Sequence, residues 1–425
     1  MNRKLFLAWL QLTREKARLL VALAGIAFAV ILMFMQLGFQ AALFESATRV
    51  HQSINADVVL INPRSRALIS MNNFSRRRLY QALGFDGVES INSVYVGLGT
   101  WKSSQTQRDR AILVLGIDPT RTTLHIPEIN QNLDKLKLDD VAILDRVSRP
   151  EFQPFIAEVA QGKVITPEIN GRKIKVVGLF TVGSSFGSDA LLITSEVNFL
   201  RIFKTREAGE INIGLIKLKP NTNIERITQA IKTNLPQDIQ VLTHDEFVEF
   251  EKTYWQKNTA IGFVFTLGTI MGFIVGSVIV YQVLYTNVSD HLAEYATLKA
   301  MGYKDTYLLL MVFQEALILG FLGYIPGFAI TLGLYDLTKK ATSLPMAIDI
   351  GRSLMVLILT IFMCFISGVI AVRKLQAADP ADIFLVMSYD LRIITLNTNL
   401  KNIYSTYVST SCCKSLSSQS LFWSR

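Results

Sequence analysis

The chain contains few cysteines, and this scarcity excludes two ways of building a stable domain. Of its 425 residues only three are cysteine, Cys364, Cys412 and Cys413, and none of them has the spacing of a metal-binding motif. None lies between residues 44 and 259, so this long segment contains no internal disulfide. We therefore expect neither a structural metal nor a disulfide framework.

The chain also lacks the motifs that mark nucleotide binding and hydrolysis. It has no G-x-x-x-x-G-K-[ST] loop, whose backbone amides hold phosphate groups, no H-E-x-x-H pair, and no G-x-S-x-G elbow near any of its histidines. We interpret each histidine as a surface residue or a satisfied polar residue: His51, His125, His244 and His291. Predicted helix starts and solvated faces explain the clustered acids: Asp139, Asp140, Glu246, Glu249 and Glu251. We therefore expect no catalytic residue, no cofactor and no metal ion on this chain.

Basic residues outnumber acidic ones, but not in the pattern of a nucleic-acid-binding protein. The formal net charge is +9 and the isoelectric point is near 9.3. No basic helix or aromatic stacking platform accompanies this charge. The lysines and arginines are spread over the flanks of apolar segments and over one long polar segment, so we expect no nucleic-acid partner.

What the chain has in abundance is apolar residues. They make up 50% of the chain and the mean hydropathy is +0.33, which is too apolar for a chain of this length built only of soluble domains. The excess is concentrated in four blocks with few or no charges: 19–43, 260–285, 306–335 and 353–372. Each block is long enough to cross about 30 Å of hydrocarbon as a helix in contact with membrane lipid. The first is longer than the apolar core of a signal peptide and no A-x-A site follows it, so we interpret it as a retained anchor.

The charges around the first block predict the orientation in the membrane. Five basic residues and one acid precede it, so the positive-inside rule places the N-terminus in the cytoplasm, and four crossings return the C-terminus there. The predicted segments outside the spans are a cytoplasmic lead (1–18), a periplasmic domain (44–259), a cytoplasmic connection (286–305), a short periplasmic loop (336–352) and a cytoplasmic tail (373–425). After about residue 388 the tail is rich in Ser, Thr and Asn without periodicity, and we expect it to be disordered.

The predicted periplasmic segment alternates short β-type runs with turn signals. The runs are 57–61, 111–115, 173–180 and 211–218. After the last run, Ile224, Ile227 and Ile231 have helical spacing, and the helix predicted there stops before Pro236. Together with the strand-like run 239–242, this pattern predicts a β-α-β unit. The predicted fold class is a membrane protein of four transmembrane α-helices with a large α+β periplasmic domain inserted between helices 1 and 2.

Three glycines in the second apolar block predict close helix packing. Gly268, Gly272 and Gly276 are four residues apart and therefore lie near one face of a helix, where another backbone can approach. Two interpretations remain open: contact with a second copy of the chain, and packing inside one chain.

The third apolar block contains a proline and an acid. Pro326 lacks an N–H and its ring clashes with the preceding turn, so it predicts a kink or a split near Tyr324. Glu315 is either buried in the membrane or placed at the cytoplasmic interface, since 316–335 alone is long enough to span.

The connection 286–305 predicts an amphipathic helix that ends at Gly302 as a C-cap. Such a helix in the cytoplasm rests on lipid headgroups or on a partner protein. Its sequence E-Y-A-T-L-K-A-M-G, at Glu294–Gly302, followed by Gln314-Glu315-Ala316, resembles a pattern of the FtsX/MacB-type ABC transporter permeases. The resemblance extends to the closing A-A-D-P-A-D-I at 377–383 and is closest to the cyanobacterial DevC-type exporter permeases.

This resemblance implies a multi-pass protein of the bacterial inner membrane that works as a non-catalytic homodimer. It implies two cytoplasmic ABC ATPase subunits that carry ATP and Mg, a periplasmic adaptor (membrane fusion) protein and a TolC-like outer-membrane channel. The exported substrate that it implies is lipid-like, such as a glycolipid. The residues that it assigns to coupling with the ATPase are Glu294, Thr297, Leu298, Lys299, Ala300 and Gly302. It also matches Glu315 to the acid of the third helix.

Three other functions are compatible with parts of this pattern. The first is an FtsX-like signalling permease that activates cell-wall hydrolases, and the second is lipoprotein release of the Lol type. The third is a membrane-anchored sensor without an ATPase, which leaves the cytoplasmic helix at 294–302 without a purpose.

Overall fold

The structure is a computed structural model, and it describes residues 16–102, 109–183, 187–290, 301, 305–342 and 344–376. Contacts between Cα atoms divide the chain into two units. One contains the described parts of Met1–Val30, Phe273–Gly327 and Val356–Arg425, and the other contains the described parts of Ile31–Gly272 and Phe328–Met355. Each unit has its own set of internal contacts.

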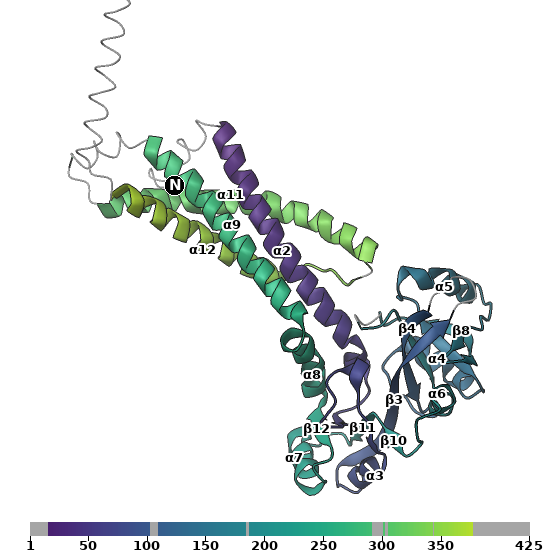
Figure 1. Ribbon diagram of the computed structural model, residues 1–425. Coiled ribbons are helices and arrows are strands. Elements are labelled where there is room, and N and C mark those ends of the chain that lie inside the picture. Colours follow the sequence, from purple (N-terminus) through teal and green to yellow (C-terminus); the bar gives the residue numbers. More distant parts are fainter. Residues whose placement is uncertain are drawn as a thin grey trace, which may run out of the picture. The chain divides into compact units, whose positions relative to one another are not determined.

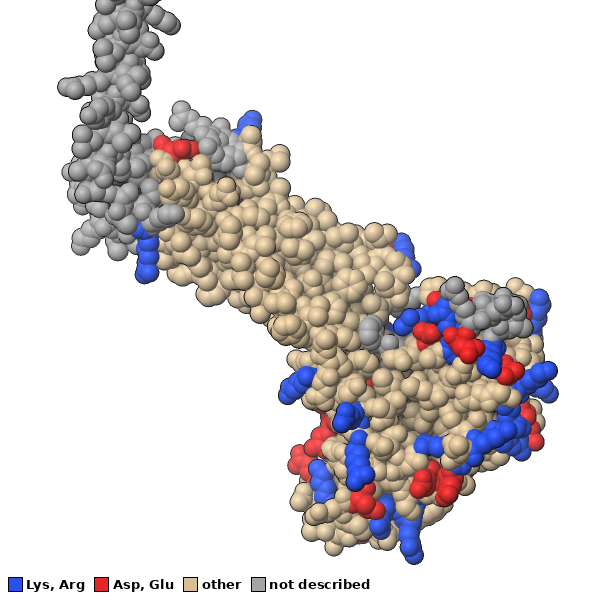
Figure 2. Space-filling model, viewed as in Figure 1, with Lys and Arg blue, Asp and Glu red and all other residues tan. Residues whose placement is uncertain are grey.

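Within the described residues, four long helices have the length and composition of membrane spans (Figure 1). They are α2 (Lys16–Ser53), α9 (Ala260–Asp290), α11 (Asp305–Thr342) and α12 (Ile350–Gln376). In Figure 2 the surface over these helices carries almost no charged side chains, whereas Lys, Arg, Asp and Glu gather over the domain inserted between α2 and α9. The predicted fold class is confirmed.

The first helix continues past its expected end at residue 43, as far as Ser53. Its apolar part, 19–43, is enough to cross about 30 Å at a rise of 1.5 Å per residue. The turns that follow carry charge, beginning with Glu45, and they contribute Val50 to a core of the inserted domain. We therefore assign 44–53 to the inserted domain, which continues to the end of α8 at Lys257.

The inserted domain is built around a ten-stranded sheet. Its main path has the order β12-β1-β11-β3-β4-β9-β5-β8, and β6 pairs with β3 and with β7. The bounds are β1 (Val58–Ile61), β3 (Val88–Lys102), β4 (Asp109–Ile117), β5 (Val141–Asp145), β6 (Glu168–Ile169), β7 (Arg172–Lys173), β8 (Lys175–Phe180), β9 (Ala190–Ser195), β11 (Ile213–Leu218) and β12 (Gln240–Thr243). A separate pair consists of β2 (Phe74–Ser75) and β10 (Glu210–Ile211). The pairs β4–β9 and β5–β8 are parallel, and the other pairs are antiparallel.

The sheet is buried on both faces because its strands are apolar at successive positions. In β1, Val58 and Leu60 belong to one core, whereas Val59 and Ile61 belong to the other. The first core is closed by α3 (Arg77–Leu83), α5 (Gln153–Ala160), α6 (Glu196–Ile202) and α7 (Ile224–Asn234). The second is closed by the end of α2, α4 (Pro127–Leu136) and α8 (His244–Lys257). Two short 3-10 helices, η1 (Leu68–Ser70) and η2 (Pro150–Phe152), complete the domain.

The β-α-β unit predicted from the sequence is present as β11-α7-β12. The side chain of Asn223 caps α7 by accepting a hydrogen bond from the Arg226 N–H. Both strands pair antiparallel with β1, which lies between them, so the unit is a split β-α-β. It places the start of α8, directly after β12, beside the end of α2.

Candidate functional site

The end of α2 meets α8 through two buried titratable side chains. His51 comes from α2 and Glu251 from α8, and neither side chain has any exposed surface. The Nε2 atom of His51 lies 3.4 Å from the Oε2 atom of Glu251. The His51 ring also packs against Phe247, with ring centroids 4.4 Å apart, which places it on the apolar face of α8.

The Glu251 carboxyl group collects contacts from three elements. Its Oε2 atom accepts a hydrogen bond of 2.8 Å from the backbone N–H of Leu68 in η1. Its Oε1 atom accepts one of 2.8 Å from Nε1 of Trp255, one turn further along α8. Neither ring nitrogen of His51 has a hydrogen-bond partner among the described residues. The carboxyl group therefore links η1 and α8 and contacts α2.

Burial controls the electrostatics of this pair. Desolvation, followed by the charge of nearby His244, lowers the pKa of His51 from 6.5 to about 3. Desolvation raises the pKa of Glu251 from 4.5 to about 7, although the hydrogen bonds from Trp255 and Leu68 favour the carboxylate. At mildly acidic pH both side chains are therefore uncharged.

These positions overturn two interpretations made from the sequence. His51 is neither exposed nor satisfied by hydrogen bonds, and Glu251 does not lie on a solvated face. The sequence carries one signal, because Phe247, Glu251 and Trp255 are four residues apart and share one helix face. A carboxyl group in such an apolar stripe needs a buried partner. Glu246, in contrast, caps the start of α8 as expected, in a capping box with Thr243.

A second contact attaches α2 to the end of β8. The Arg49 guanidinium donates a hydrogen bond of 3.1 Å to the carbonyl oxygen of Val182. The same segment is held by buried Asp145, whose carboxylate accepts from the backbone N–H groups of Val182 at 3.2 Å and Gly183 at 2.7 Å. One turn later, the Ser53 carbonyl accepts from the His125 N–H at 2.7 Å. The end of α2 is therefore fixed to two connecting segments of the inserted domain, one after β8 and one between β4 and α4.

The three glycines of α9 lie against α2 of the same chain. A Cβ atom on Gly268 would lie 2.5 Å from Cδ of Gln36, and one on Gly272 would lie 3.4 Å from Cβ of Leu32. A Cβ atom on Gly276 would lie 2.7 Å from Cβ of Ala29 and closer still to Met363 of α12. The structure thus uses all three glycines for packing inside the chain.

Pro326 does not split the third span. α11 is one helix from Asp305 to Thr342, with Pro326 inside it. The adjacent small residues face α2: a Cβ atom on Gly323 would lie 2.5 Å from Cγ2 of Ile26. The split expected as one of two outcomes near Tyr324 is therefore absent. A membrane span can contain proline without breaking, because neighbouring groups satisfy the backbone carbonyl that proline leaves without a donor.

Glu315 lies inside the helix bundle rather than at an exposed interface. Its residue surface is 6% exposed, and its Oε1 atom accepts a hydrogen bond of 2.6 Å from Nδ2 of Asn287 in α9. The acid therefore joins α9 to α11. The residues expected to contact the ATPase lie outside the described residues: Glu294, Thr297, Leu298, Lys299, Ala300 and Gly302.

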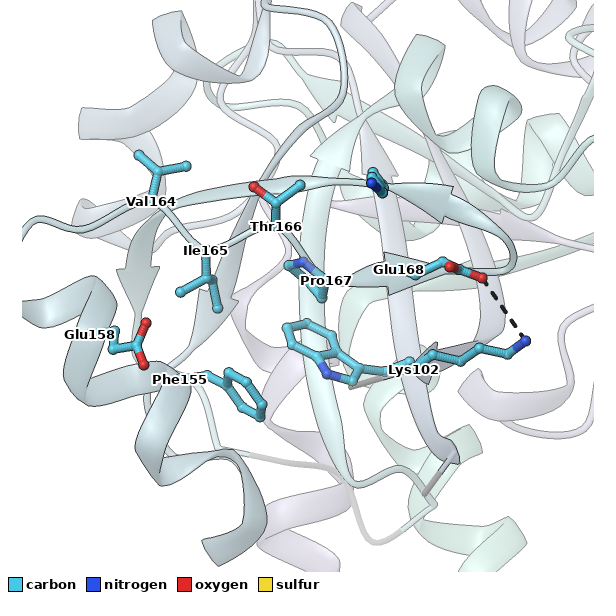
Figure 3. A pocket seen from close by; sticks show the side chains of 10 residues that line it. Lys102, Phe155, Glu158, Val164, Ile165, Thr166, Pro167 and Glu168 are labelled. Carbon is cyan, nitrogen blue, oxygen red and sulfur yellow. Dashed lines mark ion pairs between the residues drawn. The ribbon is translucent and has the colours of Figure 1, made fainter. Parts of the chain in front are cut away.

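A cavity of about 520 Å³ opens in the inserted domain between α5, β3 and the segment 164–168 (Figure 3). Ile165 and Pro167 lie along it, with Glu158 at one end and the Lys102–Glu168 ion pair, 3.9 Å long, at the other. Among the described residues that line it there is no histidine, cysteine or serine. Within the described part of the chain, no group of three or more His, Cys, Asp and Glu residues is placed to hold a metal ion.

The fold is that of an integral membrane protein with a large α/β domain between its first and second spans. Two family models match this chain: the MacB-like periplasmic core domain over residues 19–234, just over half of the chain, and the FtsX-like permease C-terminal region over residues 263–380. The chain therefore belongs to the MacB/FtsX-like family of ABC transporter permeases. No curated protein matches it.

Two solved structures are similar to part of this chain. The periplasmic region of MacB from Actinobacillus actinomycetemcomitans is 13% identical, with a TM-score of 0.32, over 46% of this chain and 92% of that chain. The extracellular domain of the noncanonic ABC-type transporter YknZ from Gram-positive bacteria is 15% identical, with a TM-score of 0.30, over 44% of this chain and 99% of that chain.

Proposed function

We propose that this chain is the membrane subunit of an ATP-driven exporter and transmits the motion of a separate ATPase to the inserted domain. The observation that carries the proposal is the attachment of α2. It is one helix from Lys16 to Ser53, and its last two turns are fixed to the inserted domain through Arg49, His51 and Ser53. Because the helix itself, and not a loop, is attached to the inserted domain, a displacement of α2 is transmitted to that domain.

The second connection to the inserted domain is also short. α8 ends at Lys257 and α9 begins at Ala260, and the Thr259 hydroxyl donates a hydrogen bond of 2.6 Å to the Trp255 carbonyl. Because Trp255 also binds Glu251, the path from α9 reaches the same buried pair that holds α2. Two helices thus converge on one joint, which suits the transmission of force.

Partner chains supply the other parts of the exporter. The chain forms a homodimer in the inner membrane of a bacterium, with both termini in the cytoplasm. Glu294, Thr297, Leu298, Lys299, Ala300 and Gly302 form the helix that rests on a cytoplasmic ABC ATPase, which holds ATP and Mg. A periplasmic adaptor and a TolC-like channel complete the route, and a glycolipid is the substrate, as in DevC-type systems. Lipid covers exposed apolar side chains of α9 such as Phe263 and Leu267.

The test is purification of the tagged chain in mild detergent, identification of co-purifying chains by mass spectrometry, and an ATPase assay of the complex. Recovery of an ATPase together with an adaptor protein supports the exporter. Recovery of an ATPase with a cell-wall hydrolase favours a signalling permease instead. If no ATPase is recovered under conditions that keep the chain folded, the proposal is wrong.

A further inference from the structure

The buried pair at the joint between α2 and α8 is more than a structural contact, because its charge state is constrained. His51 and Glu251 are each fully buried, and each has only the other as an ionisable partner within 4 Å among the described residues. With no proton the pair would bury a net negative charge, and with two protons a net positive charge. Only the state with a single proton is neutral, and a net charge in an apolar site is costly.

The nearby titratable side chains of α2 and α8 have contacts or exposure of their own. On α2, Arg49 is bonded to Glu45 and to the Val182 carbonyl. On α8, the ring Nε2 of His244 lies 3.0 Å from the His51 carbonyl oxygen, and Asp245 is fully exposed beside it. η1 contributes the backbone N–H of Leu68 and has no ionisable side chain.

We propose that His51 and Glu251 hold one proton between them as a latch joining α2 to α8, and that each partner compensates the other as the external pH changes. The latch opens when α8 moves away from α2 and both side chains reach water. In the closed state the Glu251 carboxyl keeps this proton, and its Oε2 atom lies 3.4 Å from Nε2 of the neutral His51 ring, so the joint stays uncharged.

The compensation follows from the opposite directions of the two titrations. Closing the latch raises the pKa of Glu251 from 4.5 to about 7, so closure weakens as the pH rises through this interval. Closing it lowers the pKa of His51 from 6.5 to about 3, so closure strengthens as the pH rises through that interval. Between pH 4.5 and 6.5 each effect is about tenfold per pH unit, and the two cancel. The latch is therefore constant over this range, which suits a joint in an external compartment.

Replacing one residue of the pair should reveal the pH dependence that the other residue gives to closure of the latch. In Glu251→Gln only His51 titrates, so closure should weaken up to about a hundredfold as the pH falls from 6.5 to 4.5. In His51→Gln only Glu251 titrates, so closure should weaken by a similar factor as the pH rises from 4.5 to 6.5. Opposite slopes in the two variants, with a flat profile for the unchanged protein, are the signature of the latch.

The experiment is hydrogen exchange of the full-length chain in detergent, with the Leu68 amide as reporter because it donates to Glu251. Rates are corrected for intrinsic exchange at each pH. The control is Glu249→Gln, on the exposed side of the same helix, which should match the unchanged protein. A steep profile for the unchanged protein, or variants with the same slope, would overturn the proposal.

If a variant does not fold, the infrared spectrum of the unchanged protein decides. A protonated carboxyl band at pH 6 that disappears above pH 7 supports the latch, and its absence contradicts it. The measurement needs no ATPase or substrate. Its failure therefore leaves the proposed exporter standing, and failure of the exporter leaves the latch standing.

Discussion

The Asn287 side chain of α9 donates a hydrogen bond of 2.6 Å to the carboxyl group of Glu315 in α11. These helices, α9 and α11, flank the segment 294–302, which we propose to contact the ATPase. Glu315 is almost fully buried and the contact itself is partly buried. The hydrogen bond therefore joins α9 to α11, the two helices that would receive the displacement caused by the ATPase.

Replacing Glu315 with Ala should weaken the bundle and the coupling together. Polar contacts between membrane helices contribute on the order of 1 kcal/mol each, so we expect a loss of about 1–2 kcal/mol in stability. Glu315→Gln, which keeps an acceptor for Asn287, should retain most of it. Thermal unfolding in detergent and the ATPase rate of the purified complex measure the two effects. Equal losses in both variants would argue that the charge, rather than the hydrogen bond, is what matters.

Replacing Glu251 with Ala should destabilise the inserted domain strongly. The change leaves a cavity and removes the acceptor of the Leu68 and Trp255 N–H groups, which costs on the order of 3 kcal/mol. The matched control is Glu249→Ala on the same helix, since Glu249 is exposed and pairs with Lys252 on the surface. We expect this control to change stability by less than about 0.5 kcal/mol. Denaturant unfolding followed by tryptophan fluorescence compares them, and similar losses would contradict a special role for the joint.

The sequence predicts local patterns well in this chain but not the joint. Four apolar blocks predict the spans, and the spacing of Ile224, Ile227 and Ile231 predicts α7, because each signal lies within one segment. His51 and Glu251 are 200 positions apart, and their contact depends on β12 pairing with β1, which brings α8 to the end of α2. Such long-range pairing leaves no periodicity in either segment. Only the acid in the apolar stripe of α8 hints at it.

Two glycines of α11 should respond differently to the same substitution. In Gly323→Ala the new methyl group would lie 2.5 Å from Cγ2 of Ile26, so the helices must separate, at a cost of about 1–3 kcal/mol. In Gly333→Ala nothing lies within 4 Å of the new methyl group, and the higher helix propensity of alanine should leave stability unchanged or raised by up to about 1 kcal/mol. The temperature at which each variant loses its monodisperse peak in size-exclusion chromatography tests this. A harmless Gly323→Ala would show that α2 and α11 do not pack this closely.

The last prediction concerns the connection between α9 and α11, whose role rests on sequence. Gly302→Pro removes a backbone N–H and adds a ring at the expected end of the helix, and reversal of both Glu294 and Lys299 inverts the charges presented to a partner. Either change should lower ATPase stimulation and glycolipid export while membrane insertion stays normal, because the spans themselves are unchanged. Lys304→Ala, in the same connection but outside the E-Y-A-T-L-K-A-M-G motif, is the control. If export and co-purification of the ATPase persist in both variants, the segment 294–302 does not couple the two proteins, and the force must enter the permease elsewhere.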